Sequence, residues 1–554
     1  MSHKKTQPDT PAPEGESWIG NIIDRHTDAI AIAITVLTAF MALLLFNARM
    51  SEGGDDSSYI CRALDFLAEN RYPNYQGPLY PLFLAPFIAL HGSVSVIALK
   101  FTSYALIILG QLAMYFSLRH DISRRLLLSV MLLMAVNLWF VQFGSLTYSE
   151  PLFIIFQWVL IWALLRLDSL AISQWKRVIL WAVVAGLAIV LAVLVRTAGF
   201  GFAIAAIVFL LLRRHWVHAL SIVASTAVIF SLWLVIRSAV WGDIKTDDRQ
   251  LNSLLQVDPY DPNNGLETPH GFIQRFVGNS NLYLSKHYIK MLGLRDVDSR
   301  EKSAPITIAL YILFFYGAIT AYKRNRGVLL IAVTAATMLS LTFFSLQTLW
   351  DQYRLILPYI ALMHIVVFYA ISDIIRRLAR RHRLKIMATL VFLLSAILFS
   401  RSANQADVLT LRKNLLDDPL TGYTPDWYNY LSLCQSTANL PSDAYVACRK
   451  PNMARIYSGG RKFYGIYTIP SEDADQLVEN LRSKGVTHII VASLRRDPAQ
   501  AGLGVINTIH RYLNTILKKY PLFLEQVEMC GTNETEPAAL FRLHYENAQP
   551  ASAQ

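Results

Sequence analysis

The residues that decide the fold are AIAIAITVLTAFMALLLFN at 29–47 and, shortly after, EGGDDSSY at 52–59. A helix needs about 20 mostly apolar residues to cross the hydrocarbon core of a membrane, and the first run has that length and carries no charge. No small-residue cleavage site follows it, so we expect a retained membrane span rather than a signal peptide. Two glycines then end the helix and leave Asp55 and Asp56 at the membrane face.

Composition extends this interpretation to most of the chain. Of 554 residues, 54% are apolar and only 16% are charged, whereas soluble proteins carry about 25% charged residues. A disordered protein or a small disulfide-rich scaffold is therefore excluded. Ten further apolar runs follow the first, which predicts a polytopic α-helical membrane protein with about eleven transmembrane helices. The predicted spans lie near 29–47, 95–118, 126–143, 151–167, 178–195, 198–212, 216–236, 304–322, 328–346, 355–373 and 385–400.

The net charge of +12 follows from basic loops beside these spans, and we expect no nucleic-acid partner. Lys and Arg gather in every second connection, most densely at 376–385, and basic loops stay on the cytoplasmic side of a membrane. This pattern predicts a cytoplasmic N-terminus. An odd number of spans then places the C-terminus outside.

The chain accordingly divides into a cytoplasmic tail at 1–28, a transmembrane module at 29–400 with outside loops at 48–94 and 237–303, and an extracytoplasmic domain at 401–554. The last part alternates strand-like and helix-like segments, which predicts a soluble α/β domain with a mostly parallel sheet. Its expected elements are strands at 443–448, 486–492 and 539–544 and helices at 472–484 and 506–519.

The four cysteines all fall on the predicted outside, as an oxidising compartment favours. They are Cys61, Cys434, Cys448 and Cys530. We expect one disulfide among Cys434, Cys448 and Cys530, and the sequence leaves the pairing open. Metal binding by these residues is not expected, because no CxxC spacing occurs.

Asp55 and Asp56 open the first outside loop. A helical pattern runs from Ser57 to Glu69, and a second apolar helix at 77–87 is too short to span, so it should lie in the interface. One aspartate would suffice as a helix N-cap or first-turn charge. Two adjacent acids at a lipid surface also suggest a proton acceptor or a metal ligand.

These residues carry a family resemblance. Asp55-Asp56-x-x-Tyr59-x-x-x-Ala63, followed by GPLYPL at 77–82, resembles the first-loop signature of the GT-C glycosyltransferases. Within that superfamily it is most similar to the bacterial branch related to protein mannosyltransferases and to the lipid A aminoarabinose transferase. Further similar stretches are SEPLF at 149–153, VRTAG at 195–199, QYRLILP at 352–358 and the tail segment 446–461, so the resemblance covers essentially the whole chain.

The resemblance implies a membrane glycosyltransferase. Such an enzyme moves a monosaccharide from a polyprenyl-phosphate donor to a lipid, glycan or protein acceptor at the extracytoplasmic face, with inversion of the anomeric centre. It also implies contact with membrane lipids, a location in the bacterial inner membrane, and a C-terminal domain in the periplasm. A divalent metal (Mg, Mn or Zn) is a candidate cofactor, and the sequence leaves open whether the protein uses one.

The resemblance also suggests roles for individual residues. Asp55 is the expected catalytic base, and Asp56 is its substitute or a metal ligand. The candidates for binding the donor phosphate are Arg62, Arg196, Lys286 and Arg354. In the aminoarabinose transferase branch an Arg follows the acid more closely, whereas here Ser58 takes that place, which weakens the assignment of Arg62.

A second group of residues is expected to bind the acceptor or to orient the reacting groups. It consists of Glu150, Tyr59, Tyr80 and His287, with Glu150 also a candidate metal ligand beside Asp56. His270 and His287 both lie in the long second outside loop, where a lone histidine is more often merely solvated.

Other functions fit the same composition. A polysaccharide polymerase or ligase is also polytopic, but its chemistry would centre on Arg and His of a late loop and would not need an acidic pair after the first span. A transporter or flippase would place charges inside the spans, where few occur here. A non-catalytic scaffold that displays the tail would leave Asp55-Asp56 unexplained.

Overall fold

The computed structural model describes residues 22–242, 244, 252, 254–258, 264–296, 299–495, 505–532 and 536–548. Most of the predicted cytoplasmic tail at 1–28 lies outside these residues, as do parts of the predicted loop at 237–303.

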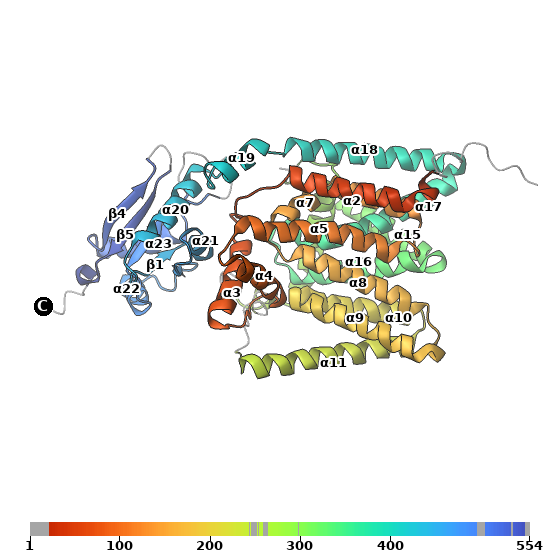
Figure 1. Cartoon of the computed structure of the whole chain (residues 1–554), viewed down its shortest axis with the longest axis horizontal. Helices are drawn as coiled ribbons and strands as arrows, with labels where there is room; N and C mark the ends of the chain where they lie inside the picture. The colour runs from red at the N-terminus through yellow and green to blue at the C-terminus, as the bar shows by residue number, and fades with distance from the viewer. Residues whose placement is uncertain are drawn as a thin grey trace, which may run out of the picture.

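Parallel and antiparallel apolar helices form the larger part of the molecule (Figure 1). Among the described residues, nine helical segments are long and apolar enough to cross a membrane, and each coincides with a predicted span. Their helices are α2 (Thr27–Leu44), α5 (Val96–Leu118), α8 (Glu150–Asp168), α9 (Trp175–Val195), α11 (Trp216–Trp241), α15 (Ala304–Arg324), α16 (Arg326–Ser345), α17 (Ile360–Leu378) and α18 (Arg383–Asn404). The chain is an integral membrane protein.

Two predicted spans have a different form. The run at 126–143 is broken into α6 (Arg124–Ala135) and α7 (Leu138–Val141) with η1 (Gln142–Ser145), and the two parts are bent by 69°. The break occurs at Asn137, whose side chain accepts hydrogen bonds from the amides of Trp139 and Phe140 and so begins a new helix in a new direction.

The run at 198–212 forms a short apolar helix, η3 (Thr197–Gly199) with α10 (Phe200–Leu212). Its 16 residues (Thr197–Leu212) give a length of about 24 Å, which is less than the ~30 Å of a typical hydrocarbon core. It nevertheless lies in the bundle, where it packs against α16, α11 and α9.

The basic loops meet at one end of the bundle. Arg326 pairs with Asp121 at 2.7 Å and with Asp168 at 3.5 Å, and Asp168 also pairs with Arg213 at 3.1 Å. The first loop and the C-terminal domain lie at the opposite end (Figure 1). This arrangement agrees with the predicted sidedness, whose orientation in a membrane stays a prediction.

The first loop consists of α3 (Asp55–Glu69) and α4 (Leu79–His91), close to the predicted helices. Between them Gly77 packs directly on the end of α9, because a Cβ atom at Gly77 would lie 2.1 Å from the carbonyl oxygen of Val195. This contact holds the first loop against Arg196, the residue that follows α9.

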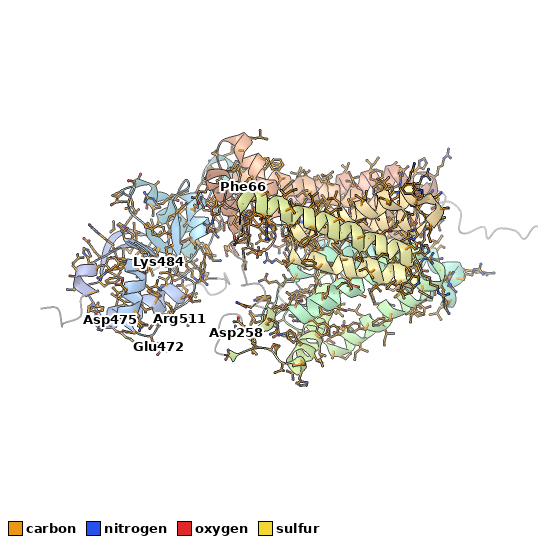
Figure 2. The ribbon with its side chains drawn as sticks, turned by 90° about the horizontal axis from the view of Figure 1, so that it is seen from below. Phe66, Asp258, Glu472, Asp475, Lys484 and Arg511 are labelled. Atoms are coloured by element: carbon orange, nitrogen blue, oxygen red, sulfur yellow. The ribbon has the colours of Figure 1, made fainter. Side chains whose placement is uncertain are left out.

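The C-terminal domain has helices on both sides of a five-stranded sheet, which confirms the α/β prediction. Its helices are α19 (Val408–Leu416), α20 (Pro425–Ser436), α21 (Pro451–Tyr457), α22 (Ala474–Ser483) and α23 (Thr508–Lys519), and its strands are β1 (Val446–Cys448), β2 (Phe463–Gly465), β3 (His488–Val491), β4 (Leu524–Cys530) and β5 (Ala538–Leu543). Glu472, Asp475 and Arg511 lie on the border of this domain, whereas Phe66 marks the end of the bundle that faces it (Figure 2).

The prediction of a mostly parallel sheet is correct for β2, β1 and β3 but not for the edge of the sheet that β5 and β4 form. The strand order is β2-β1-β3-β5-β4, and β2, β1 and β3 are parallel, but β5 runs antiparallel to both β3 and β4. Strands β2 and β4 were not predicted; β4 follows α23 and pairs with β5 as a hairpin. A hairpin connection makes two strands antiparallel.

The predicted disulfide is not formed in the structure, where Cys61, Cys434, Cys448 and Cys530 are free thiols. Cys448 on β1 and Cys530 on β4 are separated by two strands, which at about 4.8 Å per strand exceeds the reach of a disulfide. Cys434 and Cys448 are both fully buried, and both contact the hydroxyl of Tyr430.

The basic loops and the C-terminal domain lie at opposite ends of the helical bundle, so cysteines introduced at these two places should be accessible from opposite sides of the membrane. Glu472→Cys in the C-terminal domain and Arg381→Cys in the basic loop both replace exposed residues. A membrane-impermeant maleimide should label the first from outside spheroplasts and the second only in inverted vesicles. Three native cysteines are buried and Cys530 is half-buried, so maleimide labelling of the parent chain measures the background from these residues. Labelling of both variants from one side would contradict the topology.

Candidate active site

Asp56 is directed into the protein. Helix α3 starts after Gly54, whose φ of +86° is favourable for glycine, and the Asp56 carboxylate accepts hydrogen bonds from the amides of Ser51 at 2.6 Å and Ser57 at 2.7 Å. Its side chain is buried, and burial raises the pKa of Asp56 to about 6. Asp56 therefore closes the turn that precedes α3.

Asp55 has the opposite orientation and pairs with Arg354, which follows α16 in the chain. The Asp55 side chain is 33% exposed, so it reaches solvent without lying in bulk water. The Arg354 guanidinium also lies 5.0 Å from the ring centroid of Tyr148. Burial alone would lower the pKa of Arg354, but the nearby Glu150 and Asp55 carboxylates raise it, so Arg354 stays charged.

A second ion pair lies beside the first. Glu150, at the start of α8, is buried and lies 2.6 Å from the Arg196 guanidinium. Arg196 also donates to the Ser149 hydroxyl at 3.2 Å, and that hydroxyl lies 3.1 Å from the hydroxyl of Tyr59 on α3. The N-terminus of α8, the end of α9 and α3 therefore meet at this point. Glu150 also lies in the first turn of α8, where a carboxylate is favourable.

Lys286 and His287 form a third cluster with Asp351. Both lie on η5 (Asn281–Tyr288), a π-helical segment, and both contact the Asp351 carboxylate, His287 through Nε2 at 2.7 Å. Burial lowers the pKa of His287 to about 4 despite its acidic partner, so the imidazole is neutral at pH 7. For Asp351, burial raises the pKa, but Lys286 and His287 outweigh burial and leave the pKa lowered.

Three other predicted residues have different surroundings. Arg62 lies over the ring of Tyr59 and donates to the Tyr75 carbonyl and, at 3.4 Å, to the Gln76 side chain, so it holds the connection between α3 and α4. Tyr80 is fully buried edge-on against Tyr59. His270 is on α13 (Pro269–Ser280) and contacts Gln274 at 3.0 Å.

Sequence reasoning missed two residues of this end of the molecule. Lys100, near the start of α5, is buried and donates to the carbonyls of Asn47, Arg49 and Ser145, and a charge within an apolar run was the available signal. Asp351 immediately precedes the QYRLILP stretch that the sequence analysis singled out, but nothing in the sequence showed that it faces Lys286 and His287.

The predicted metal ligands do not converge. Asp56 faces backbone amides and Glu150 faces Arg196, and no group of three His, Cys, Asp or Glu side chains in the described part of the chain is arranged to hold a metal ion. The donor set at Asp56 and Glu150 therefore does not fit the proposed metal site.

The fold has a known counterpart. Two crystal structures of ArnT from Cupriavidus metallidurans, one bound to undecaprenyl phosphate and one in the apo state, match with TM-scores of 0.54 and 0.53. Each match covers 94% of this chain, and 99% and 98% of the respective ArnT chains, at 12% identity. The chain has the fold of these ArnT structures. No protein-family model matches this sequence, and neither does any curated protein.

The ArnT match confirms the fold predicted from the resemblance, including the C-terminal α/β domain. At 12% identity the likeness to ArnT concerns the fold. The positions of Asp55, Arg354, Glu150 and Arg196 follow from the side chains of this protein itself.

The buried Asp56 predicts a pH-dependent stability. Its pKa rises from 3.8 in the unfolded chain to about 6 in the folded protein, so its stabilising contribution is present below pH 4 and is lost as the pH rises through 6. Asp56→Asn removes this titration. In detergent, the melting temperature of the parent relative to Asp56→Asn should therefore fall between pH 4 and pH 7. Parallel melting profiles across that range would contradict it.

Proposed function

We propose that this protein is an integral membrane glycosyltransferase that transfers a monosaccharide from a polyprenyl-phosphate donor to a lipid, glycan or protein acceptor. The observation that carries the proposal is the pairing of Asp55 with Arg354 next to the buried Glu150–Arg196 pair. A general base and two guanidinium groups then lie at one end of a membrane bundle, as glycosyl transfer from a lipid phosphate requires.

Asp55 is the proposed base. An acceptor hydroxyl is a poor nucleophile, and a carboxylate within hydrogen-bond reach can take its proton while the oxygen attacks the anomeric carbon. The partly exposed Asp55 can meet an acceptor, whereas the buried Asp56 cannot. One base and direct displacement by the acceptor oxygen would invert the anomeric centre.

Arg354 and Arg196 are the proposed ligands of the donor phosphate. Charge develops on the phosphate oxygen as the bond to the sugar breaks, and charge-assisted hydrogen bonds from a guanidinium stabilise it. In the structure Arg354 is bound to Asp55, so a donor phosphate would compete for Arg354 and release the base. Glu150 orients Arg196 in this scheme, and Lys286 and His287 lie in the adjacent cluster with Asp351.

The proposed donor class has support from the comparison. One ArnT structure with this fold is bound to undecaprenyl phosphate, which is a polyprenyl phosphate. The basic loops lie at the end opposite to Asp55, and such loops remain cytoplasmic, which supports transfer at the outer face of a bacterial inner membrane.

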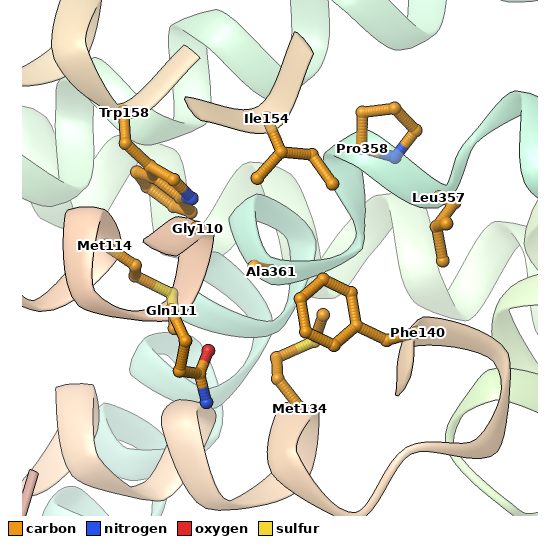
Figure 3. A pocket seen from close by; sticks show the side chains of 10 residues that line it. All are labelled: Gly110, Gln111, Met114, Met134, Phe140, Ile154, Trp158, Leu357, Pro358 and Ala361. Carbon is orange, nitrogen blue, oxygen red and sulfur yellow. The ribbon is translucent and has the colours of Figure 1, made fainter. Parts of the chain in front are cut away.

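A transporter or flippase has less support. A small pocket between α5, α6, α8 and α17 is lined by apolar residues and Gln111 (Figure 3). The amide of Gln111 donates to the Met131 carbonyl at 2.7 Å. The side chains around this pocket are uncharged, so this pocket lacks the charges that usually mark a conduction path.

The test of the proposal is Asp55→Asn, assayed in membranes with labelled polyprenyl-phosphate sugars. Loss of a general base should reduce transfer by about 10²–10⁴-fold while expression is kept. Asp296→Asn is the matched control, because its side chain is 93% exposed in a surface pair with Arg401. Unchanged turnover in Asp55→Asn would remove the base assignment.

Arg354 gives a second prediction. Arg354→Gln removes a donor that stabilises the developing phosphate charge, so kcat should fall by about 10²–10³-fold. Arg354→Lys keeps the charge without the planar fork and should lose less. Steady-state kinetics of both variants measure this order, and equal kcat in Arg354→Gln and the parent would exclude the role.

A further inference from the structure

The turn that carries Asp55 is held from two directions. From the bundle, Lys100 donates to the carbonyls of Asn47 at 2.6 Å and Ser145 at 2.7 Å. From the C-terminal domain, Lys450 donates to the carbonyls of Glu52 at 2.7 Å and Gly53 at 3.1 Å. Tyr423 of the same domain donates to the carbonyl of Met50 at 2.7 Å. The residues between α2 and α3 are thus joined to both parts of the molecule.

Lys450 itself has a fixed position. It lies between the end of β1 and the start of α21, and its carbonyl accepts a hydrogen bond from the buried Tyr430 hydroxyl at 3.2 Å. Its ammonium group lies 5.8 Å from the ring centroid of Trp427, whose indole N–H is bound to the Arg495 carbonyl at 2.8 Å. The end of β1 and the side chains of α20 therefore fix the position of Lys450.

The contact is made at the point where the direction of Asp55 is set. The Lys450 ammonium bonds the carbonyls two and three residues before Asp55, and a Cβ atom at Gly54 would lie 3.5 Å from its nitrogen. Gly54 has a positive φ in this turn, and Asp55 follows it directly and pairs with Arg354.

The C-terminal domain also forms ion pairs with the rest of α3. Arg455 pairs with Asp65 at 2.6 Å, and Lys462 pairs with Glu69 at the end of the helix. Lys462 differs from Lys450 in one respect that matters for a test. Its partner is an exposed side chain far along α3, whereas the partners of Lys450 are backbone carbonyls beside the proposed base.

We propose that Lys450 is a positioning residue through which the C-terminal domain holds the catalytic turn, so that this domain is part of the active enzyme. The inference rests on the proposed function for its effect on catalysis. Its structural part, the fixation of residues 51–57 by Lys450, does not depend on any activity.

The experiment compares Lys450→Met, Lys450→Arg and Lys462→Met in the full chain. Amide hydrogen exchange at 51–57 should increase about tenfold or more in Lys450→Met and stay near the parent in the other two, since local opening controls exchange. Binding of undecaprenyl phosphate should stay within about twofold of the parent in all three. The kcat of transfer should fall about tenfold or more in Lys450→Met, because small misplacements of a reacting group are costly, and Lys450→Arg should restore most of it.

The outcomes separate the two proposals. Unchanged hydrogen exchange at 51–57 in Lys450→Met would overturn the fixation of this turn by Lys450. Increased exchange with full turnover, in a protein that Asp55→Asn inactivates, would overturn the positioning role. If exchange increases but Asp55→Asn is fully active, the proposed function is wrong, whereas the fixation of residues 51–57 by Lys450 is supported. Should Lys450→Met not fold, Tyr423→Phe removes the neighbouring hydrogen bond to Met50 and should show the same exchange response.

Discussion

The buried Glu150 carboxylate is the constraint on which this end of the molecule depends. A carboxylate removed from water is costly unless it is paired with a cation, and the Arg196 guanidinium lies 2.6 Å from the Glu150 carboxylate. Arg196 can reach Glu150 only because α9 ends at Val195, and the first loop can approach only because Gly77 lacks a side chain. One electrostatic requirement thus fixes α8, α9 and the first loop relative to one another.

The charges around it form matched pairs. Asp55 with Arg354, Glu150 with Arg196, and Asp351 with Lys286 and His287 leave the site close to neutral without a ligand. An anionic ligand would therefore exchange partners with carboxylates already in place. Such an exchange costs less free energy than bringing free charges out of water. It also means that a phosphate that binds Arg354 would release the Asp55 carboxylate from its ion pair.

Local patterns predicted much of the fold. The lengths of the apolar runs predicted eleven spans, and nine of them coincide with long apolar helices in the described residues. The pattern from Ser57 to Glu69 predicted α3, and the alternation in the tail predicted β1, β3 and β5. The break at Asn137 was missed because the run stays apolar through it. The strand β4 was missed because its exposed face gives it few apolar residues.

Part of the candidate site was predicted from the family resemblance. Asp55, Glu150, Arg196 and Arg354 lie in stretches that resemble a known family, and the structure brings them together. Arg62 was expected with them, but its reach to the Tyr75 carbonyl depends on the course of the loop, which no spacing reveals. Lys100, Asp351 and Lys450 act on partners distant in the chain, so only the folded molecule shows their role.

The short helix Thr197–Leu212 has a consequence for the surrounding lipid. Hydrophobic mismatch makes a bilayer thin locally around a helix that is too short, or draws polar flanking side chains toward the headgroups. The helix begins directly after Arg196, so lipid headgroups beside it would lie deeper than around the neighbouring long helices. The distance between a lipid phosphate and Arg196 would then depend on the thickness of the host membrane, since a thicker bilayer would hold the phosphate farther from Arg196.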